Sequence, residues 1–354
     1  MNQLTSLINQ LKKQQEQLLP FVVYRKPQSQ KIQALLQRDD VLYTVDDFSE
    51  SGFVLAPFCG TPVLIPTEKA SLVQEDCSVL NHHTTSEIDS LAQDESQVIH
   101  EQLVQKGIEA IHSNQFDKVV LSRSETLEIK HFDWAEVFLR MVDLYPTAFA
   151  YCFYHPKVGM WLGAFAEQLV HFSKGQLTTM SVAGTQLIQA QQQPFWGEKE
   201  KQEQQFVTDF ILDGLKKYTT HIEHSAPYSI QAGKLWHLRT DIQAKAEEDQ
   251  LKNIINFLHP TPAVCGFPKV EARSFILENE GYDRGYYSGF LGELNWDDST
   301  DLFVNLRCLQ VVVSPLNPST KVILYVGGGI TRDSQPQKEW LETVHKAQTM
   351  KMVL

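Results

Sequence analysis

The sequence predicts an α+β fold in which large antiparallel β-sheets form a sandwich core and helices pack outside it. Strand-like runs follow one another as adjacent pairs joined by short turns, a pattern typical of antiparallel sheets. One example is QLVHFSKGQLTTMSVAGTQ, which predicts a hairpin with Lys174 and Gly175 at its turn. Helical runs lie between the groups of strands, so we expect helices to cover the sheets.

The first part of the chain, residues 1–95, is expected to form a sheet and cap portion of this fold. A first helix is predicted over 3–19, where apolar residues recur at near-helical spacing: Leu4, Leu7, Ile8, Leu11 and Leu18. Short strands separated by glycine and proline turns then follow in FVVYRKP, VLYTVDDF, GFVLAPF and TPVLIP. The pair His82 and His83 is expected in a polar loop rather than in a metal site.

The second part, residues 96–354, carries the candidate chemistry. Helices are predicted over 96–112, 133–143, 198–218 and 247–258, in the region from Ala272, and from near Gln337. Strands are predicted in FDKVVLSRSETLEI, AFAYCFYH, KVGMWLGAF, the hairpin above, 227–231, 234–239, YYSGFLGELNW, DLFVNLRCLQVVV and VILYV. The glutamine-rich stretch 189–193 is expected to be a short linker or mobile loop that does not divide domains.

Composition narrows the classes of partner. The chain has 354 residues, 42% of them hydrophobic and 21% charged, and a net charge of −12, which is ordinary for a globular protein but acidic. This charge argues against a nucleic-acid partner, since no basic stripe offsets it. An acidic protein that binds an anionic substrate needs a local cation, either a metal or a few placed arginine and lysine side chains.

The five cysteines are widely spaced and form no CxxC pair, which favours free thiols in a reducing compartment. The N-terminal segment has no apolar core of a signal peptide, and no apolar run approaches the ~20 residues of a membrane span. We therefore expect a soluble cytoplasmic protein with no membrane partner.

Two pairs of glutamates indicate a metal site. Glu200 and Glu203 lie three residues apart on one predicted helix, and Glu339 and Glu342 repeat the spacing on another. Two carboxylate pairs on two helices can close on one hard cation, and Mg²⁺ prefers a few carboxylates together with an anionic substrate. Either pair alone is more often solvated surface than a metal site.

Glycines mark places where the backbone could approach a ligand. Gly327, Gly328 and Gly329 follow the apolar run VILYV directly and precede a proline-containing turn, and Gly184 lies in SVAGTQ. The alternative is that these glycines serve turns alone.

Three charged residues lie in apolar surroundings. Lys118 interrupts FDKVVLSR, where burial would lower its pKa and make it a usable general base; the alternative is a strand-edge lysine with its head in water. Glu167, in WLGAFAEQLVHF, would have a raised pKa and could donate a proton, unless it faces outward from a strand. Arg307, flanked by apolar residues in FVNLRCLQVVV, suits a substrate carboxylate or a structural ion pair.

Two histidines complete the candidates. His237 in LWHL and His259 in LHPTPAVCG are each interpreted as buried, hydrogen-bonded structural residues in preference to functional ones.

Read in order, these segments resemble the chorismate-utilising enzymes, a family that includes anthranilate, aminodeoxychorismate, salicylate and isochorismate synthases. The resemblance rests on FDKVVLSR, WLGAFAEQL, SVAGTQ, the Glu200/Glu203 helix, LWHL, LHPTPAVCGFP, GYDRGYYSGFLGEL, VNLRC and YVGGGI…EWLETVHKA. It covers about residues 96–354, which makes this the expected chorismate-binding catalytic region, and within the family it is most similar to isochorismate synthases.

The resemblance implies a role for each matching residue. Lys118 would be the base that activates water, and Glu167 the acid that protonates the leaving hydroxyl. Positions that contact the substrate in the family are occupied by Gly184, Ala263, Arg307, Gly327 and Lys346. By the same pattern Glu203 and Glu342 would hold Mg²⁺, supported by Glu200 and Glu339.

Three positions depart from family patterns. Ala183 replaces the lysine that marks one aminodeoxychorismate synthase type, Gln204 follows Glu203 where the family has histidine, and Gln186 stands where arginine is common. The change at Gln204 weakens the metal assignment slightly, because it lies next to the proposed ligand.

The resemblance thus implies a magnesium-dependent isomerisation of chorismate to isochorismate, in which water is added and the ring hydroxyl is lost. The alternatives are a salicylate synthase, which eliminates pyruvate afterwards, and a non-catalytic chorismate-binding homologue. We expect a monomer without a glutaminase subunit. The sequence leaves open whether the product serves menaquinone or siderophore synthesis.

Overall fold

The computed structural model describes residues 3–77, 89–90, 93–187, 194–232, 235–312 and 319–354. The pair His82 and His83 and the stretch 189–193 lie outside these ranges.

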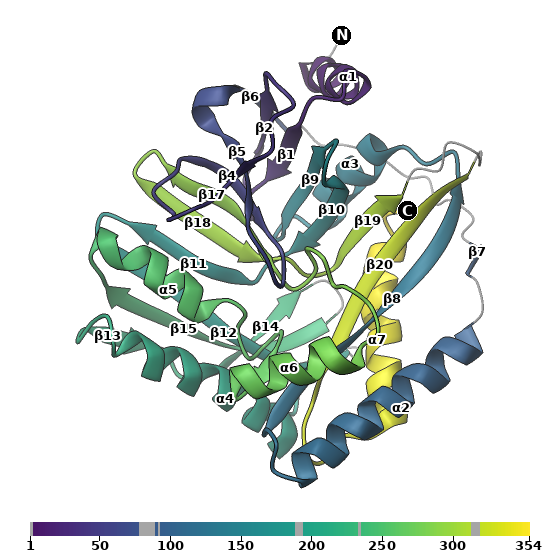
Figure 1. Cartoon of the computed structure of the whole chain (residues 1–354), viewed down its shortest axis with the longest axis vertical. Coiled ribbons are helices and arrows are strands. Elements are labelled where there is room, and N and C mark those ends of the chain that lie inside the picture. The colour runs from purple at the N-terminus through teal and green to yellow at the C-terminus, as the bar shows by residue number, and fades with distance from the viewer. Residues whose placement is uncertain (1–2, 78–88, 91–92, 188–193, 233–234, 313–318) are drawn as a thin grey trace.

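In the described residues, two antiparallel sheets of ten strands each form the body of the molecule (Figure 1). In spatial order the first sheet contains β16 (Gly266–Phe267), β8 (Lys118–Lys130), β20 (Ser319–Ile330), β19 (Cys308–Val312), β10 (Gly159–Phe165), β9 (Phe149–His155), β1 (Phe21–Arg25), β2 (Lys31–Gln37) and β6 (Ala70–Asp76), with β7 (Asp89–Ser90) beside β8. The second contains β13 (Ile222–His224), β15 (Leu235–Lys245), β12 (Gln176–Leu187), β11 (Gln168–Ser173), β18 (Ser299–Val304), β17 (Phe290–Trp296), β4 (Gly52–Ala56), β5 (Val63–Pro66) and β3 (Tyr43–Thr44), with β14 (Tyr228–Ala232) beside β15. The predicted fold class is confirmed.

An aromatic core fills the space between the sheets. The ring of Phe149 from the first sheet lies 4.7 Å from that of Phe303 in the second, and Tyr24 stacks on Phe149 at 5.5 Å. Strands β1 and β4 are buried along their whole length because both of their faces are covered. Residues 21–76 supply strands to both sheets, and these pair with later strands such as β9 and β17.

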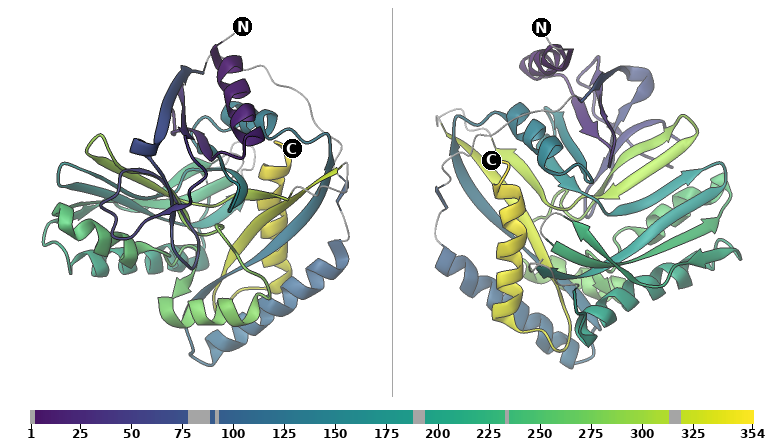
Figure 2. Two further views of the ribbon diagram at one scale, coloured as in Figure 1. Left: turned by 45° about the horizontal axis from the view of Figure 1, so that its top comes forward. Right: turned by 180° about the vertical axis from the view of Figure 1, so that it is seen from behind.

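Helices cover the outer faces. Helices α1 (Gln3–Glu16) and α3 (Trp134–Leu144) pack on the first sheet, and α4 (Glu198–Leu215) and α5 (Leu251–Leu258) pack on the second. Helices α2 (Gln93–His112) and α6 (Lys269–Asn279) share a smaller core with β8, while α7 (Pro336–Lys351) runs along β20 and contacts α2 (Figure 2). Short 3₁₀ turns occur at Thr67–Lys69 and Glu248–Gln250.

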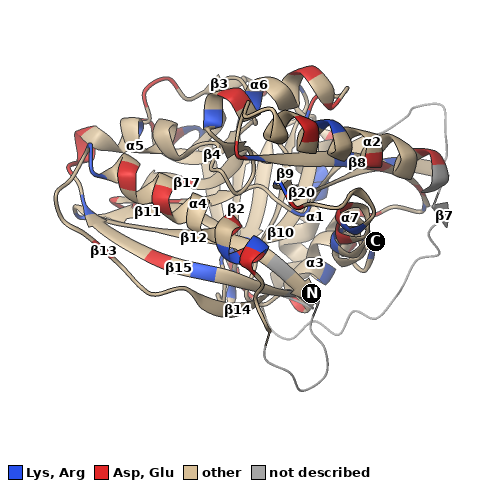
Figure 3. Cartoon of the chain, turned by 90° about the horizontal axis from the view of Figure 1, so that it is seen from below, with Lys and Arg blue, Asp and Glu red and all other residues tan. Residues whose placement is uncertain are grey.

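Acidic residues are spread along outer helices such as α2 and α4 (Figure 3). Within the described ranges, no helix is both long and apolar enough to cross a membrane.

The chain crosses between the sheets at two places that matter for function. It passes from β10 of the first sheet to β11 of the second, and later from β18 of the second sheet to β19 of the first. The prediction that DLFVNLRCLQVVV is one strand was therefore wrong. Arg307 lies between two strands of different sheets, with a positive φ of 44°. An apolar run alone cannot distinguish one long strand from two shorter ones whose sheets both face the same core.

Other strands also differ from those that the sequence predicts. Strands Lys31–Gln37 and Ala70–Asp76 were not predicted, because they lie toward the end of their sheet and are rich in polar residues; β6 is exposed along most of its length. The run VLYTVDDF contributes only the two residues of β3. The hairpin turn at Lys174 and Gly175 is confirmed, with φ values of 50° and 74°.

Candidate active site

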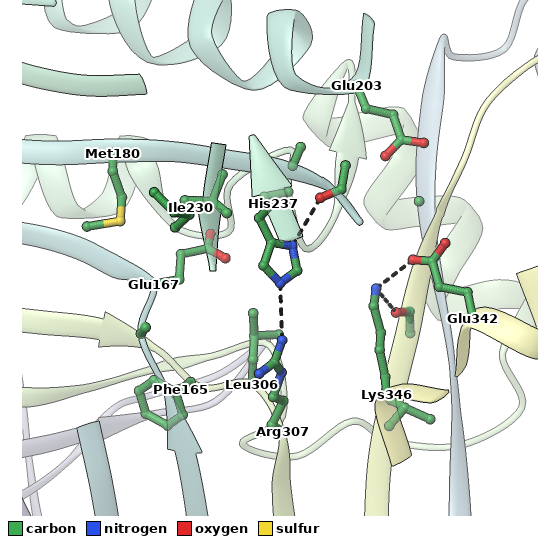
Figure 4. Close-up of a pocket in the computed structure, with 18 of the residues that line it drawn as sticks. Phe165, Glu167, Met180, Glu203, Ile230, His237, Leu306, Arg307, Glu342 and Lys346 are labelled. Carbon is green, nitrogen blue, oxygen red and sulfur yellow. Dashed lines mark hydrogen bonds and ion pairs between the residues drawn. The ribbon is translucent and has the colours of Figure 1, made fainter. Parts of the chain in front are cut away.

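A cavity of about 150 Å³ is lined by both sheets, both crossings and helices α4 and α7 (Figure 4). We call it the inner cavity. It brings together most of the residues singled out by the sequence: Lys118, Glu167, Gly184, Glu203, Ala263, Arg307, Gly327, Glu342 and Lys346. Glu200 and Glu339 do not line it.

Lys118 is the first residue of β8 and pairs with Phe267 of β16. Its side chain is buried, with 1% of the residue exposed, so the interpretation that its head lies in water is wrong. Burial lowers the pKa of Lys118, an effect that the charges of Glu203 and Glu167 oppose only in part. The residue therefore loses its proton more readily than an ordinary lysine.

Glu167 lies at the first crossing, between β10 and β11, and not on a strand face. Its backbone oxygen accepts a hydrogen bond of 2.9 Å from the N–H of Val304, which fixes the crossing against β18. Burial raises the pKa of Glu167 to about 7, against the opposing charges of Lys118, Lys346 and Arg307. A carboxyl group with this pKa is partly protonated at neutral pH.

Arg307, at the second crossing, is held by a histidine. Its Nη2 lies 3.2 Å from Nε2 of His237, and Nδ1 of His237 lies 3.0 Å from the backbone oxygen of Gly184. Because a guanidinium can only donate, Nε2 must accept and Nδ1 must carry the hydrogen that is donated to Gly184. Burial, followed by the charge of Arg307, lowers the pKa of His237 to about 3, so the ring is neutral.

His237 thus has a place in the site that the sequence did not assign. The sequence feature that could have indicated this role is a histidine inside an apolar strand. The same feature is also found for histidines that are purely structural. His259, interpreted in the same way, does serve the fold: its Nε2 lies 3.1 Å from the backbone oxygen of Pro57 and its ring packs edge-on against Phe290.

Lys346 links helix α7 to strand β20. Its Nζ lies 2.8 Å from Oε1 of Glu342 and donates a 2.9 Å hydrogen bond to the backbone oxygen of Gly327 (Figure 4). Burial would raise the pKa of Glu342, but Lys346 outweighs this effect and the pKa is lowered. Glu342 is therefore ionised at neutral pH.

Three of the four paired glutamates, Glu203, Glu339 and Glu342, lie beside two glycines of β20. A Cβ added to Gly329 would lie 3.2 Å from Oε2 of Glu203, and one added to Gly328 would lie 3.7 Å from Oε2 of Glu339 and 3.8 Å from Oε1 of Glu342. Burial raises the pKa of Glu203 to about 7. Within the described ranges, no three acidic, histidine or cysteine side chains are grouped as a ready metal site.

A lysine that the sequence analysis did not consider lies among these acids. Nζ of Lys199 is 2.5 Å from Oε1 of Glu339 and 3.7 Å from Oε1 of Glu203. Oε2 of Glu339 is buried without a hydrogen-bond partner in the described chain. Oε2 of Glu200 lies 3.0 Å from where a Cβ of Gly197 would be, at the start of α4.

The glycines of the YVGGGI segment continue the strand and do not form a turn after it. Gly327, Gly328 and Gly329 pair with β8 in regular register. A Cβ on Gly327 would lie 2.8 Å from the backbone oxygen of Leu121, and one on Gly329 would lie 3.1 Å from Cε of Lys118. The missing side chains therefore make room for the neighbouring strand and for the buried lysine.

Gly184 is a different case. It interrupts the pairing of β12 with β15 as a bulge, with a φ of 74°, and a Cβ there would lie 3.1 Å from Cβ of Glu200. The bulge turns its carbonyl toward His237.

A buried ion pair fixes the loop that carries Ala263. Arg284 and Glu280 pair at 2.5 Å, and Arg284 also donates to the backbone oxygens of Val264 at 2.9 Å and Val120 at 2.7 Å. The loop is thereby joined to β8 two residues beyond Lys118.

Comparison with known proteins places this cavity in context. The sequence model of the family described as "Chorismate binding enzyme" matches residues 64–354. The salicylate biosynthesis isochorismate synthase of Pseudomonas aeruginosa is 30% identical over 263 residues, which is 71% of this chain and 53% of that protein. Isochorismate synthase EntC of Escherichia coli K12 is 29% identical over 271 residues, 72% of this chain and 66% of that protein. The chain thus spans about half to two thirds of the length of these relatives.

Solved structures agree in fold. A putative 2,3-dihydroxybenzoate-specific isochorismate synthase, DhbC of Bacillus anthracis, superposes with a TM-score of 0.78 at 21% identity, covering 97% of this chain and 98% of that one. MenF, the menaquinone-specific isochorismate synthase of Escherichia coli, gives 0.77 at 21% identity, covering 95% and 88%.

Proposed function

This chain belongs to the chorismate-binding enzyme family, and we propose that it is an isochorismate synthase, an isomerase that converts chorismate to isochorismate. The observation that carries the proposal is the presence of Lys118 and Glu167 in one cavity. Burial lowers the pKa of the lysine and raises that of the glutamate, so each group is shifted toward the protonation state that a base or an acid requires.

In the proposed reaction, neutral Lys118 takes a proton from water as its oxygen bonds to a ring carbon. The ring double bonds shift, and the bond between a second ring carbon and its hydroxyl breaks. Glu167 gives its proton to that departing hydroxyl, which leaves as water. One water enters and one leaves, so the product is an isomer of chorismate and no redox cofactor is needed.

Cationic side chains would hold the substrate, which carries two carboxylates. Arg307 is oriented by His237, and Lys346 is oriented by Glu342 and Gly327, so both cations are fixed before substrate arrives. Gly184, Ala263 and Gly327 line the same cavity and supply backbone surface for the ring.

The residues also fit a magnesium ion. Carboxylate oxygens are the ligands that Mg²⁺ prefers, and the unpartnered buried oxygen of Glu339 lies beside Gly328 together with an oxygen of Glu342. We propose that Glu203 and Glu342 hold the ion, with Glu339 and Glu200 in support. When bound, Mg²⁺ would neutralise a substrate carboxylate in a site already rich in negative charge.

The product of the purified protein with chorismate and Mg²⁺ tests the proposal. An isomer with the mass of chorismate supports it, and unchanged chorismate would contradict it. Salicylate together with pyruvate would assign the chain to the alternative activity, salicylate synthase, which is compatible with the same base, acid and carboxylates.

The proposed chemistry also bears on the need for other subunits and on the cellular compartment. Because water is the nucleophile, no glutaminase is needed to supply ammonia, and we expect a monomer to suffice, since every residue proposed above belongs to one chain. The five cysteines are free thiols, as expected for the cytoplasm.

A further inference from the structure

A second cavity adjoins the inner one. It measures about 390 Å³ and shares Phe165, Ala166 and Arg307 with the inner cavity, so the two meet at the sheet crossings. We call it the outer cavity. Its remaining walls come from the segment that joins α3 to β9, from β14, and from the C-terminal end of α7.

The two cavities differ in the exposure of the residues that line them. All described residues that line the inner cavity are buried or half-buried. The outer cavity has exposed residues at its rim: Leu144, Pro146, Thr147 and Gln231. Its floor is formed by buried residues such as Ala148, Ala164 and Met350. The outer cavity therefore leads from the surface to Arg307.

The walls of the outer cavity are held in place by polar contacts. The hydroxyl of Tyr145 donates to the backbone oxygen of Thr349, which joins the 144–148 segment to α7. Arg25 donates to the backbone oxygens of Tyr145 and Ala148 at 2.6 and 3.2 Å. Thr147 lies between these two anchored residues, so its position at the rim is fixed.

Charge favours the passage of an anion. Arg307 is the one charged residue among those that line the outer cavity in the described chain. Within the same ranges its guanidinium donates only to His237, and a guanidinium has five N–H donors, so others remain for a ligand. Arg307 also lines the inner cavity, so a carboxylate in the outer cavity would lie beside a cation that the two cavities share.

We propose that the outer cavity is the entrance through which the dicarboxylate substrate reaches the inner cavity, with Arg307 at the junction. This inference rests on the proposed function for the choice of ligand. A bulky side chain at the rim should then slow both arrival and departure without changing the equilibrium affinity, because the bound state lies beyond the obstruction.

The test is the rate of chorismate binding to two rim variants, Thr147→Phe and Leu144→Trp. A Lys118→Gln background prevents turnover, and stopped-flow fluorescence gives the association and dissociation rate constants. Thr220→Phe is the matched control, since Thr220 is exposed in a separate surface hollow. We expect both rate constants to fall about tenfold or more in the rim variants, with Kd unchanged, and neither to change in the control.

Two results would overturn the inference. If association stays within about twofold of the parent in both rim variants, substrate enters elsewhere. If dissociation alone becomes faster, the outer cavity holds bound substrate and does not admit it. The proposed function is judged separately by the product that wild-type enzyme makes, so a different product would reject that function while leaving the entrance measurement valid.

Discussion

Nζ of Lys199 lies 2.5 Å from Oε1 of Glu339, on the side of the inner cavity where the proposed magnesium ligands gather. Glu339 is almost fully buried, and the charges of Glu339, Glu203 and Glu342 outweigh burial to raise the pKa of Lys199. The ammonium is therefore the counter-ion of these acids, and it should compete with any metal ion that they bind.

Replacement of Lys199 by glutamine should act in opposite directions on stability and metal affinity. Without metal, the loss of a buried partner should reduce the free energy of unfolding by on the order of 3 kcal/mol. Mg²⁺ should bind more tightly, because one positive charge has gone. Denaturant unfolding and calorimetric titration measure the two effects.

Lys201→Gln is the matched control, because Lys201 pairs with Glu198 on the exposed face of the same helix. It should change stability by no more than about 0.5 kcal/mol. Unchanged metal-free stability in Lys199→Gln would show that the contact with Glu339 does not neutralise the acids.

Turnover of chorismate should require a divalent cation. Glu203→Ala or Glu342→Ala should abolish it while the fold remains, because the substrate carboxylate would lose its counter-ion. In wild type, Mg²⁺ should also raise the melting temperature, and this rise should shrink in both variants. Glu198→Ala, an exposed position on α4, should behave as wild type; full activity in excess chelator would refute the requirement.

Lys118→Gln should lower kcat by at least about 100-fold, the usual effect of losing a general base. Lys130→Gln, at the opposite, exposed end of the same strand, should have no such effect. Magnesium binding, measured by calorimetry, should change little. Near-normal conversion by Lys118→Gln would mean that another group activates the water.

The rate should depend on pH in a bell-shaped manner. Glu167 donates only while protonated, so activity should fall as pH rises through about 7. Lys118 accepts only while neutral, so activity should also fall as pH decreases through the lowered pKa of that lysine. Glu167→Gln should remove the limb at high pH and lower kcat by about 100-fold. A full kcat profile in which the high-pH limb survives this substitution would assign the acid to another residue.

Arg307→Lys should raise KM clearly. The planar fork of arginine donates to a carboxylate through two N–H groups, and a lysine cannot reproduce it. Loss of one charge-assisted hydrogen bond of roughly 1.5 kcal/mol corresponds to about tenfold in affinity. Arg239→Lys, which keeps a half-exposed ion pair with Asp241, is the control. Wild-type steady-state kinetics in Arg307→Lys would count against the assignment.

Much of this site could be expected from local sequence. A lysine and a glutamate in apolar runs predict shifted pKa values wherever the runs are buried, because desolvation acts on the charged form regardless of the partner. The spacing of Glu200 with Glu203 and of Glu339 with Glu342 predicts paired acids on helices. The alternation of hairpins and helices was likewise sufficient to predict the fold class.

Other features depended on contacts between segments far apart in the chain. No local pattern indicates that Lys199 contacts Glu339, which is 140 residues away. His237 was interpreted as structural because an apolar strand does not reveal what its side chains face. Glu200 and Glu203 have the same local spacing as a metal pair, yet only Glu203 lines the cavity.

Most of the helices and hairpins, and the residue types able to perform acid–base chemistry, could be predicted from the sequence, since both depend on neighbours along the chain. The places where strands change sheets became clear only in the folded chain. Glu167 and Arg307 each lie where the chain crosses from one sheet to the other, and there the backbone leaves the ladder and turns a side chain into the space between the layers. An apolar run contains no mark of such a crossing, because the residues on either side are buried equally by both sheets.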